Sequence, residues 1–499
     1  MTPSRARLVL LCGLILGTVG DIVVRGEFWP LGFVVCVLLS VGALLMVGWP
    51  EPFRFDASEE SRDRLLLAGG MVLASCGLVL RDAGTILFFD TLALLSCAAL
   101  LVWSMRGAVL RSIQPGDLII GWWEGALAAG FGMPLLVFKE LELPSAAPTS
   151  GRKFRAILLG LILAVPPILL VASLLGEADP AFGKFLDRLA EFGITDALQH
   201  LMVAAAIAWP VTGWLRGASR SRPGAGRWGL DLSPRIDFFG VAPALYGVAI
   251  LLAGYLAFQA RALFGGAAYV EATTGLTFAE YARRGFFELV AVTAIVLAVL
   301  LAADWALDRE DSVAARRFRA TGWLVVVLIG ILMVSALQRM WTYMTYFGLS
   351  DTRLYATAGM TWLGVAVGWF GWTILRGDRA RFGFGLLIAS AAWVATLNVI
   401  NPEAIVVRVN LGRALAGAAF DIPYHAALSP DAYPAVIAAA AGLPTAQCRE
   451  LVGRLHDQWH IRTERAGVRD WRSWSLPRSR MTEVMEVPVT LLQDQTCGA

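Results

Sequence analysis

Charged side chains are scarce in this sequence. Asp, Glu, Lys and Arg make up 16% of the 499 residues, whereas soluble domains carry about 25%. The formal net charge is only +3, which excludes the strongly basic surface typical of nucleic-acid binding. Hydrophobic residues reach 57%, and apolar runs of about 20 residues recur, the length that crosses about 30 Å of hydrocarbon. The sequence therefore predicts an all-α integral membrane protein.

Cysteine motifs are absent as well. The six cysteines include no C-x-x-C pair, so the sequence offers neither a zinc ribbon nor a thiol redox motif. The first four lie in apolar runs and are interpreted as small hydrophobic residues. Cys448 and Cys497 lie near the C-terminus, where they could form a disulfide if that region meets an oxidising compartment.

Catalytic fingerprints are lacking too, because no P-loop, G-x-S-x-G or Rossmann motif follows a strand. His456 and His460 are four residues apart on a predicted helix, a spacing that suits metal chelation. Asp457 replaces the glutamate of H-E-x-x-H, however, and no third ligand is evident. A solvated helix face explains the pair better. We expect no metal and no cofactor, and we lean against an enzyme.

Apolar segments long enough to cross a bilayer are what the sequence has in abundance. The first is expected to remain as a helix, because no good signal-peptide cleavage site follows it and another span comes at once. We place eleven spans at about residues 8–24, 30–49, 65–80, 84–104, 156–175, 197–215, 236–258, 285–304, 319–338, 355–375 and 383–400.

A further segment, residues 118–138, is long enough to cross but contains Glu124 and Pro134. Lys and Arg favour the cytoplasmic side and can decide between the alternatives. If the segment does not cross and the N-terminus is inside, the cytoplasmic loops hold more than twice as many Lys and Arg as the outer loops. If it crosses, the bias reverses. We therefore predict a re-entrant or interfacial segment, a cytoplasmic N-terminus and an extracytoplasmic tail from Asn401.

This topology divides the chain into five regions. In chain order they are a four-helix membrane region, a cytoplasmic loop with the ambiguous segment, two membrane helices with a basic loop, a five-helix core and a small helical tail. They cover residues 1–104, 105–155, 156–234, 235–400 and 401–499, respectively.

The stretch "TGLTFAEYARRGFFELVAV" concentrates charge beside an apolar run. Glu280, Arg284 and Glu288 are spaced i, i+4, i+8 and share one helix face, with Tyr281 as a nearby interfacial aromatic residue. They either anchor the helix at the membrane surface or line the mouth of an internal cavity. Glu288 favours the cavity, because an ionisable group inside an apolar span is costly unless paired.

Other polar residues gather near the predicted outer ends of the spans. Asp90, His200, Asn398 and Asn401 are the clearest cases. This bias predicts a polar site open to the extracytoplasmic face, unless some spans are drawn a turn too long.

A polar hairpin, "QRMWTYMTYFGLSDTRLY", joins the ninth and tenth spans. Gly348 is typical of a helix stop, and Ser350 or Asp351 of the next N-cap. The simpler interpretation is a tight outer turn with an aromatic belt. The alternative adds Arg339 and Arg353 as groups that bind an anion.

Several of these stretches together resemble a bacterial family of polytopic membrane proteins. They include "AEYARRGFFEL", "YFGLSDTRLY", "LNVINPEAIVVRVNLGRAL" and "LSPDAYPAV". We identify the family as the domain of unknown function four-one-seven-three, and the resemblance covers residues 235 to about 440. It implies a location in the bacterial inner membrane and no particular activity. The positions that carry it are Gly275, Tyr281, Arg284, Gly285, Glu288, Gly348, Arg353, Asn401, Pro402, Asn410 and Asp421.

Our leading functional interpretation is a multi-pass protein with an outward-facing polar pocket that binds a solute, an ion or a lipid head group, as a transporter or sensor does. The expected partners are the bilayer and such a ligand, and not nucleic acid. One alternative is an enzyme acting on a lipid-linked substrate, with Glu288 or Asp90 as acid or base. Another is a scaffold or signalling partner without a pocket.

Overall fold

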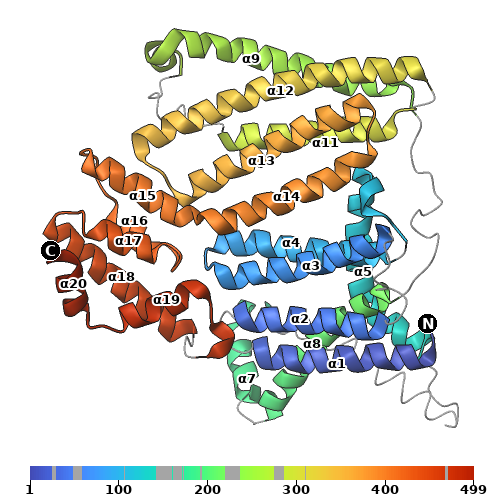
Figure 1. The fold of residues 1–499 in the computed structure, drawn as a ribbon, viewed down its shortest axis with the longest axis vertical. Helices are drawn as coiled ribbons and strands as arrows, with labels where there is room; N and C mark the ends of the chain where they lie inside the picture. The colour runs from blue at the N-terminus through green and yellow to red at the C-terminus, as the bar shows by residue number, and fades with distance from the viewer. Residues whose placement is uncertain are drawn as a thin grey trace.

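The chain folds in a computed structural model as a long stack of membrane helices with a helical tail at one end (Figure 1). The structure describes residues 1–24, 30–48, 59–105, 107–141, 174–190, 194–219, 236–274, 286–308, 311–466 and 470–498, with residues 160 and 171. Over these residues the regular structure is helical, apart from an isolated bridge between Ile236 and Leu307. The protein is therefore an all-α polytopic membrane protein, as predicted.

Eleven helices of the described chain are long and apolar enough to cross a membrane. All but α5 coincide with predicted spans, whereas the predicted span at 156–175 lies almost wholly outside the described residues. These helices are α1 (Pro3–Val24), α2 (Pro30–Gly48), α3 (Glu59–Leu80), α4 (Gly84–Ser104), α5 (Pro115–Lys139), α8 (Ile194–Ala218), α9 (Phe238–Thr274), α11 (Phe286–Ala306), α12 (Ser312–Phe347), α13 (Asp351–Thr373) and α14 (Ala380–Ile400).

The membrane helices form two packed halves. Helices α1 to α5 and α8 enclose one apolar core, and α9 and α11 to α13 enclose another. Helix α14 joins them, because its Phe382 belongs to the second core while Phe384 and Leu387 pack against the first. In Figure 1 the helices lie across the picture, with α9 at the top and α1 at the bottom.

The membrane helices begin and end on two opposite sides of this stack, and these two sides differ. We call the end where α3, α12 and α14 finish the tail end, because the tail covers it, and the opposite end, which holds the N-terminus, the far end (Figure 1). The turn between α12 and α13 shows how the sequence builds the tail end. Gly348 ends α12 with φ of 78°, and the Ser350 side chain caps α13 by accepting from the backbone N–H of Arg353, as the sequence predicted.

Helix α5 does not run alongside its neighbours. Figure 1 shows it at a steep angle to α3 and α4, at the far end of the stack. Just before α5, Ile113 packs against Gly383 in the first turn of α14. Just after it, Glu140 accepts a hydrogen bond at 2.7 Å from Arg216, near the last residue of α8. Both ends of α5 thus meet far-end residues, a geometry that favours the prediction that 118–138 does not cross.

The tail is a helical unit with its own core and a disulfide. Buried residues from α15 to α20 form a cluster separate from the two membrane cores, and Cys448 bonds to Cys497, with Cα atoms 5.8 Å apart. Its elements are α15 (Pro402–Leu415), α16 (Ile422–Ala427), α17 (Tyr433–Ala440), α18 (Thr445–Ala466), η3 (Trp471–Ser473), α19 (Leu476–Met485) and α20 (Val489–Cys497). The shorter elements elsewhere are η1 (Leu110–Ser112), α7 (Pro180–Ala190) and η2 (Ile374–Arg376).

Candidate functional site

The predicted ladder of Glu and Arg is only partly described. Glu280, Tyr281 and Arg284 lie outside the described residues, and Glu288 is exposed in the first turn of α11. The described contacts do not join Glu288 to the other predicted site residues. A single pocket that contains both Glu288 and Asp90 therefore has no support from the described geometry.

His200 forms a separate pair with Asp21. Its Nδ1 lies 2.5 Å from Asp21 Oδ2, which links α8 to α1 near the tail end. Asp21 is buried, while about half of the His200 side chain is exposed. Helices α1 and α8 approach closely here, because a Cβ at Gly17 would lie 2.4 Å from the backbone oxygen of Ala204. The pair therefore stabilises the contact between two tightly packed helices.

Arg339 and Arg353 both interact with the protein itself. Arg339 is buried in α12, where the side-chain oxygen of Gln259, in its better-satisfied orientation, accepts from Arg339 Nη2 at 2.7 Å. Arg353 donates at 3.2 Å to the carbonyl of Phe347, which closes the C-terminus of α12, and at 3.0 Å to the hydroxyl of Tyr343. Its guanidinium also stacks on the Tyr343 ring. These contacts favour the tight-turn interpretation over an anion site.

Asp90, Asn398 and Asn401, in contrast, lie in one network at the tail end. Asn398 Nδ2 donates to Asp90 Oδ1 at 2.9 Å, joining α14 to α4. Asn401 has φ of 49°, a left-handed conformation that Asn tolerates better than most residues, and its Oδ1 caps α15 through the N–H of Ala404. Its Nδ2 donates to the backbone carbonyl of Asp431. The chain thus turns from the last membrane helix into the tail at Asn401.

Asp431 is the centre of this network, and sequence reasoning missed it. Its Oδ2 accepts from the backbone N–H groups of Asp82 and Ala83, both at 2.7 Å, in the turn just before α4. Arg81 adds a weak ion pair at 3.5 Å, while its Nε donates to the carbonyl of Asn398 at 2.7 Å. A carboxylate from the tail therefore occupies the turn between α3 and α4, which precedes it by about 350 residues.

Two further carboxylates complete the contact. Glu403 Oε2 accepts from the backbone N–H and hydroxyl of Ser429, at 2.9 and 2.6 Å. Asp82 accepts from Arg478 Nε of the tail at 2.8 Å. We call the resulting set the junction cluster. Its members are Arg81, Asp82, Asp90, Asn398, Asn401, Glu403, Ser429, Asp431 and Arg478.

Burial controls the charge of the tail carboxylates in the junction cluster. Burial raises the pKa of Asp431 above its usual range, against the lowering effect of the N–H donors of Asp82 and Ala83. Burial also raises the pKa of Glu403, although hydrogen bonds from Ser429 lower it. Both groups therefore bind a proton more readily when the tail is docked than they would in water.

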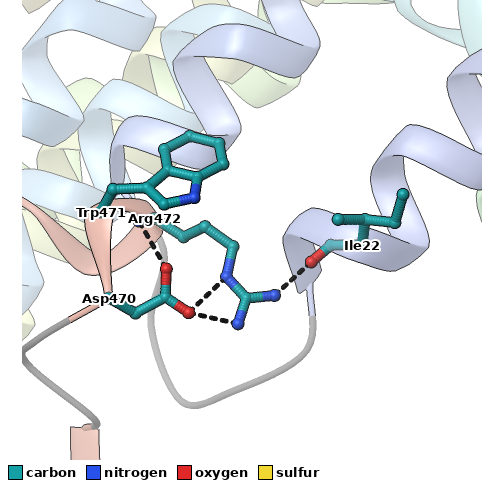
Figure 2. Close-up of a pocket in the computed structure, with 4 residues that line it drawn as sticks. All are labelled: Ile22, Asp470, Trp471 and Arg472. Carbon is teal, nitrogen blue, oxygen red and sulfur yellow. Dashed lines mark hydrogen bonds and ion pairs between the residues drawn. The ribbon is translucent and has the colours of Figure 1, made fainter.

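A shallow depression lies where the tail meets α1, and none of the residues that line it belongs to the junction cluster. It has a volume of about 580 Å³ and is lined by Ile22, Asp470, Trp471 and Arg472 (Figure 2). Figure 2 shows Arg472 held between the carboxylate of Asp470 and the backbone oxygen of Ile22. Because these partners occupy the guanidinium, the depression is a poor site for an anion.

Comparison with known families places these residues in context. Residues 68–439 match the family described as Domain of unknown function (DUF4153). The chain belongs to this family. The family number inferred from the sequence was therefore wrong, and the DUF4153 match begins well before residue 235, where the resemblance was thought to start. No curated protein and no solved structure matches the chain.

The DUF4153 match includes nearly all of the junction cluster. It begins within α3 and ends within α17, so it contains both Arg81 and Asp431. It leaves out α1, α2 and the helices from α18 onward, and with them Arg478. The family segment thus contains the membrane-helix residues of the junction cluster and those of its tail residues that come first in the sequence. The protein is a multi-pass membrane protein of this family.

Proposed function

We propose that the protein is a sensor or transporter of the bacterial inner membrane whose extracytoplasmic tail closes over an outward-facing polar site. The observation that carries this proposal is the burial of Asp431 from the tail against the backbone N–H groups of Asp82 and Ala83, in the turn just before α4. Under the closed tail lie Asp90 and Asn398, the polar pair that extends into the membrane helices. A solute, an ion or a lipid head group would reach this pair when the tail lifts.

The disulfide supports an extracytoplasmic tail. Disulfides persist in oxidising compartments such as the bacterial periplasm and are rare in the cytosol. Cys448 and Cys497 join α18 to α20, two helices of the tail core. The bias of Lys and Arg toward the opposite loops favours the same orientation. We propose that the N-terminus, at the far end, is cytoplasmic.

The form of the contact favours a tail that can move. The tail has an apolar core distinct from both membrane cores, so it keeps its packing when it lifts. The junction cluster consists of charged, amide and hydroxyl groups, which water can solvate once the contact opens. Interfaces between domains that are polar rather than apolar permit relative motion by default. The enzyme alternative has no comparable support, because no groove beside a junction carboxylate is described.

Cysteine labelling tests both the orientation and the lid. In cells expressing the full chain with its first four cysteines replaced and the disulfide kept, we would introduce Asp457→Cys on the tail or Asp378→Cys at the far end. Both positions are exposed. We expect a membrane-impermeant maleimide to label position 457 in intact cells and position 378 only after permeabilisation. Labelling of position 457 only after permeabilisation would eliminate the outward-facing site.

A buried probe reports on the lid itself. Ala83 is 1% exposed beneath Asp431, so Ala83→Cys should react only when the tail lifts. Asp431→Ala leaves two N–H groups without an acceptor, each worth about 1–3 kcal/mol, and should accelerate labelling at least tenfold. Asp431→Asn is the matched control, because its side-chain oxygen can still accept both bonds. Equal rates in the alanine variant and the parent chain would show that the tail is not a lid.

A further inference from the structure

Asp90 is a buried acid within a membrane helix. It is the seventh residue of α4, about 9 Å along the helix from its first residue, and it is 1% exposed. Its described surroundings supply one hydrogen bond, from Asn398, and no charged partner. A lone carboxylate at such a position is costly as an anion, by several kcal/mol, unless a positive charge compensates it.

The ionisable groups on neighbouring elements serve other partners. Arg81 donates to the carbonyls of Asn398 and Val399, and Asp431 accepts from the turn before α4. Helix α14, which packs on α4, brings Asn398, an uncharged amide, to Asp90. The charged groups in the turn before α4 and in the tail that contacts it are Arg81, Asp82, Asp431 and Arg478, whereas the one hydrogen bond described for Asp90 comes from Asn398.

The orientation of Asn398 leaves two oxygen atoms without donors. Its Nδ2 donates both to Asp90 Oδ1 and, at 3.2 Å, to the carbonyl of Val394, which fixes the amide. Asn398 Oδ1 and Asp90 Oδ2 are then buried without a hydrogen-bond partner in the described part of the chain. Buried acceptors without donors are rare in folded proteins, so each calls for a physical explanation. Here the two acceptors belong to one hydrogen-bonded pair.

Glycine makes room for this carboxylate. A Cβ built at Gly77 of α3 would lie 2.5 Å from Asp90 Oδ2 and 2.7 Å from Oδ1, closer than atoms can approach. Alanine at position 77 would therefore displace the acid group. The backbone of α3, the carboxylate of α4 and the amide of α14 thus form a niche between three helices.

We infer that Asp90 and Asn398 bind one small monovalent cation, a proton or Na⁺, between Asp90 Oδ2 and Asn398 Oδ1. A proton on Oδ2 donates to Asn398 Oδ1 and completes a cyclic acid–amide pair. Na⁺ takes both oxygens as ligands, the hard donors that such cations prefer. Either species neutralises the single buried charge. This inference rests on the proposed function for its access route, because the cation enters from outside when the tail lifts.

Infrared difference spectroscopy of the full chain in lipid nanodiscs tests the site. We would subtract spectra of Asp90→Asn from those of the parent protein, from mildly acidic to alkaline pH, in choline chloride or NaCl. We expect a carboxylic-acid carbonyl band that is wholly absent from the variant. A band insensitive to Na⁺ identifies the proton, and a band that disappears in NaCl identifies a site that exchanges a proton for Na⁺. A carboxylate signal alone at every pH, unchanged by Na⁺, would overturn the inference.

Two further variants keep the test informative. Gly77→Ala should shift the acid band or its titration, because it displaces the carboxylate, and it does not depend on the folding of Asp90→Asn. An unchanged band in Gly77→Ala would show that the acid does not occupy the niche. After a pH jump the band should change faster in Asp431→Ala. If the band is present but its rate is unchanged, the cation site stands and the lid fails, so the two proposals are separately testable.

Discussion

The two ends of the helix stack treat buried charge differently. At the far end, the buried acids Glu140 and Asp304 each pair with a nearby arginine. Arg216 Nη2 lies 2.7 Å from Glu140, and Arg379 Nε lies 2.6 Å from Asp304. In the junction cluster, Arg81 pairs with Asp431 and Arg478 with Asp82. Asp90 and Glu403 instead bond to the uncharged side chains of Asn398 and Ser429. The two far-end pairs are balanced in charge, as expected for structural contacts between helices, whereas the junction cluster holds four acids and two arginines.

This difference distinguishes ion pairs that stabilise the fold from buried acids that can respond to a ligand. A balanced buried ion pair holds two elements in register and has no reason to change its protonation. An excess of buried carboxylates can respond to protons, cations or the departure of the tail, because burial shifts the balance between their charged and neutral forms. The comparison therefore assigns the far end to stability and the tail end to the proposed lid and cation site.

The largest effect is expected from breaking a far-end pair. Arg216→Ala leaves Glu140 buried without this base, and breaking such a pair costs about 3–5 kcal/mol. Both side chains are at least nine-tenths buried, so solvent screens the loss little. Unfolding in mixed micelles should show this fall in stability.

The double variant Arg216→Met with Glu140→Leu provides the control. It removes both charges and fills similar volume, so it should recover most of the loss. A single variant as stable as the parent protein would break the comparison, because the far end would then have no fastening role.

An intermediate effect is expected from pH at the tail end. Burial raises the pKa of both Asp431 and Glu403 in the docked state. A raised pKa means that docking is most stable below the ordinary carboxyl range and is weakened as pH rises through the docked pKa values. Labelling of Ala83→Cys should therefore be slower at mildly acidic pH than at neutral pH, after normalisation to the exposed Asp457→Cys, which corrects for thiol ionisation.

Asp431→Asn isolates one contribution to this dependence. Its side-chain oxygen keeps the two hydrogen bonds to the turn before α4 but has no proton to gain or lose in this pH range. Only the pH dependence that comes from Glu403 should therefore remain. A normalised labelling rate that does not change with pH in the parent chain would contradict the role assigned to these carboxylates. The same measurement at the far end, with Asp378→Cys, should show no such dependence.

The sequence predicted the helices well because their determinants are local. Apolar runs of the right length predicted every candidate span except α5, which was considered but not counted, and the distribution of Lys and Arg favoured a non-crossing α5. The turn at Gly348 and Ser350 was also predicted, since helix stops and caps are encoded within a few residues. Neither feature needed knowledge of distant contacts.

The site was predicted only in part, for the opposite reason. Asp90, Asn398 and Asn401 were selected because polar residues near span ends stand out against apolar sequence. Asp431 lies in "LSPDAYP", a stretch that resembles an ordinary helix start, and Arg81 and Asp82 resemble loop charges. Their partners lie about 350 residues away. No local pattern marks such pairs, and only a covariation signal between them could have found them.

The smallest effect on stability is expected from a charge change on the outer surface of the tail. It compares an exposed ion pair with the buried charges of the junction cluster. Glu450 and Arg454 form an i,i+4 pair at 2.9 Å, with about half of each side chain exposed. Exposed pairs of this kind contribute about 0.3–0.5 kcal/mol, and salt screens them. Glu450→Gln should therefore change the stability of the tail by no more than this amount and leave labelling of Ala83→Cys unchanged. A larger change in either measurement would mean that charge anywhere on the tail, and not the burial of charge at the junction, governs docking.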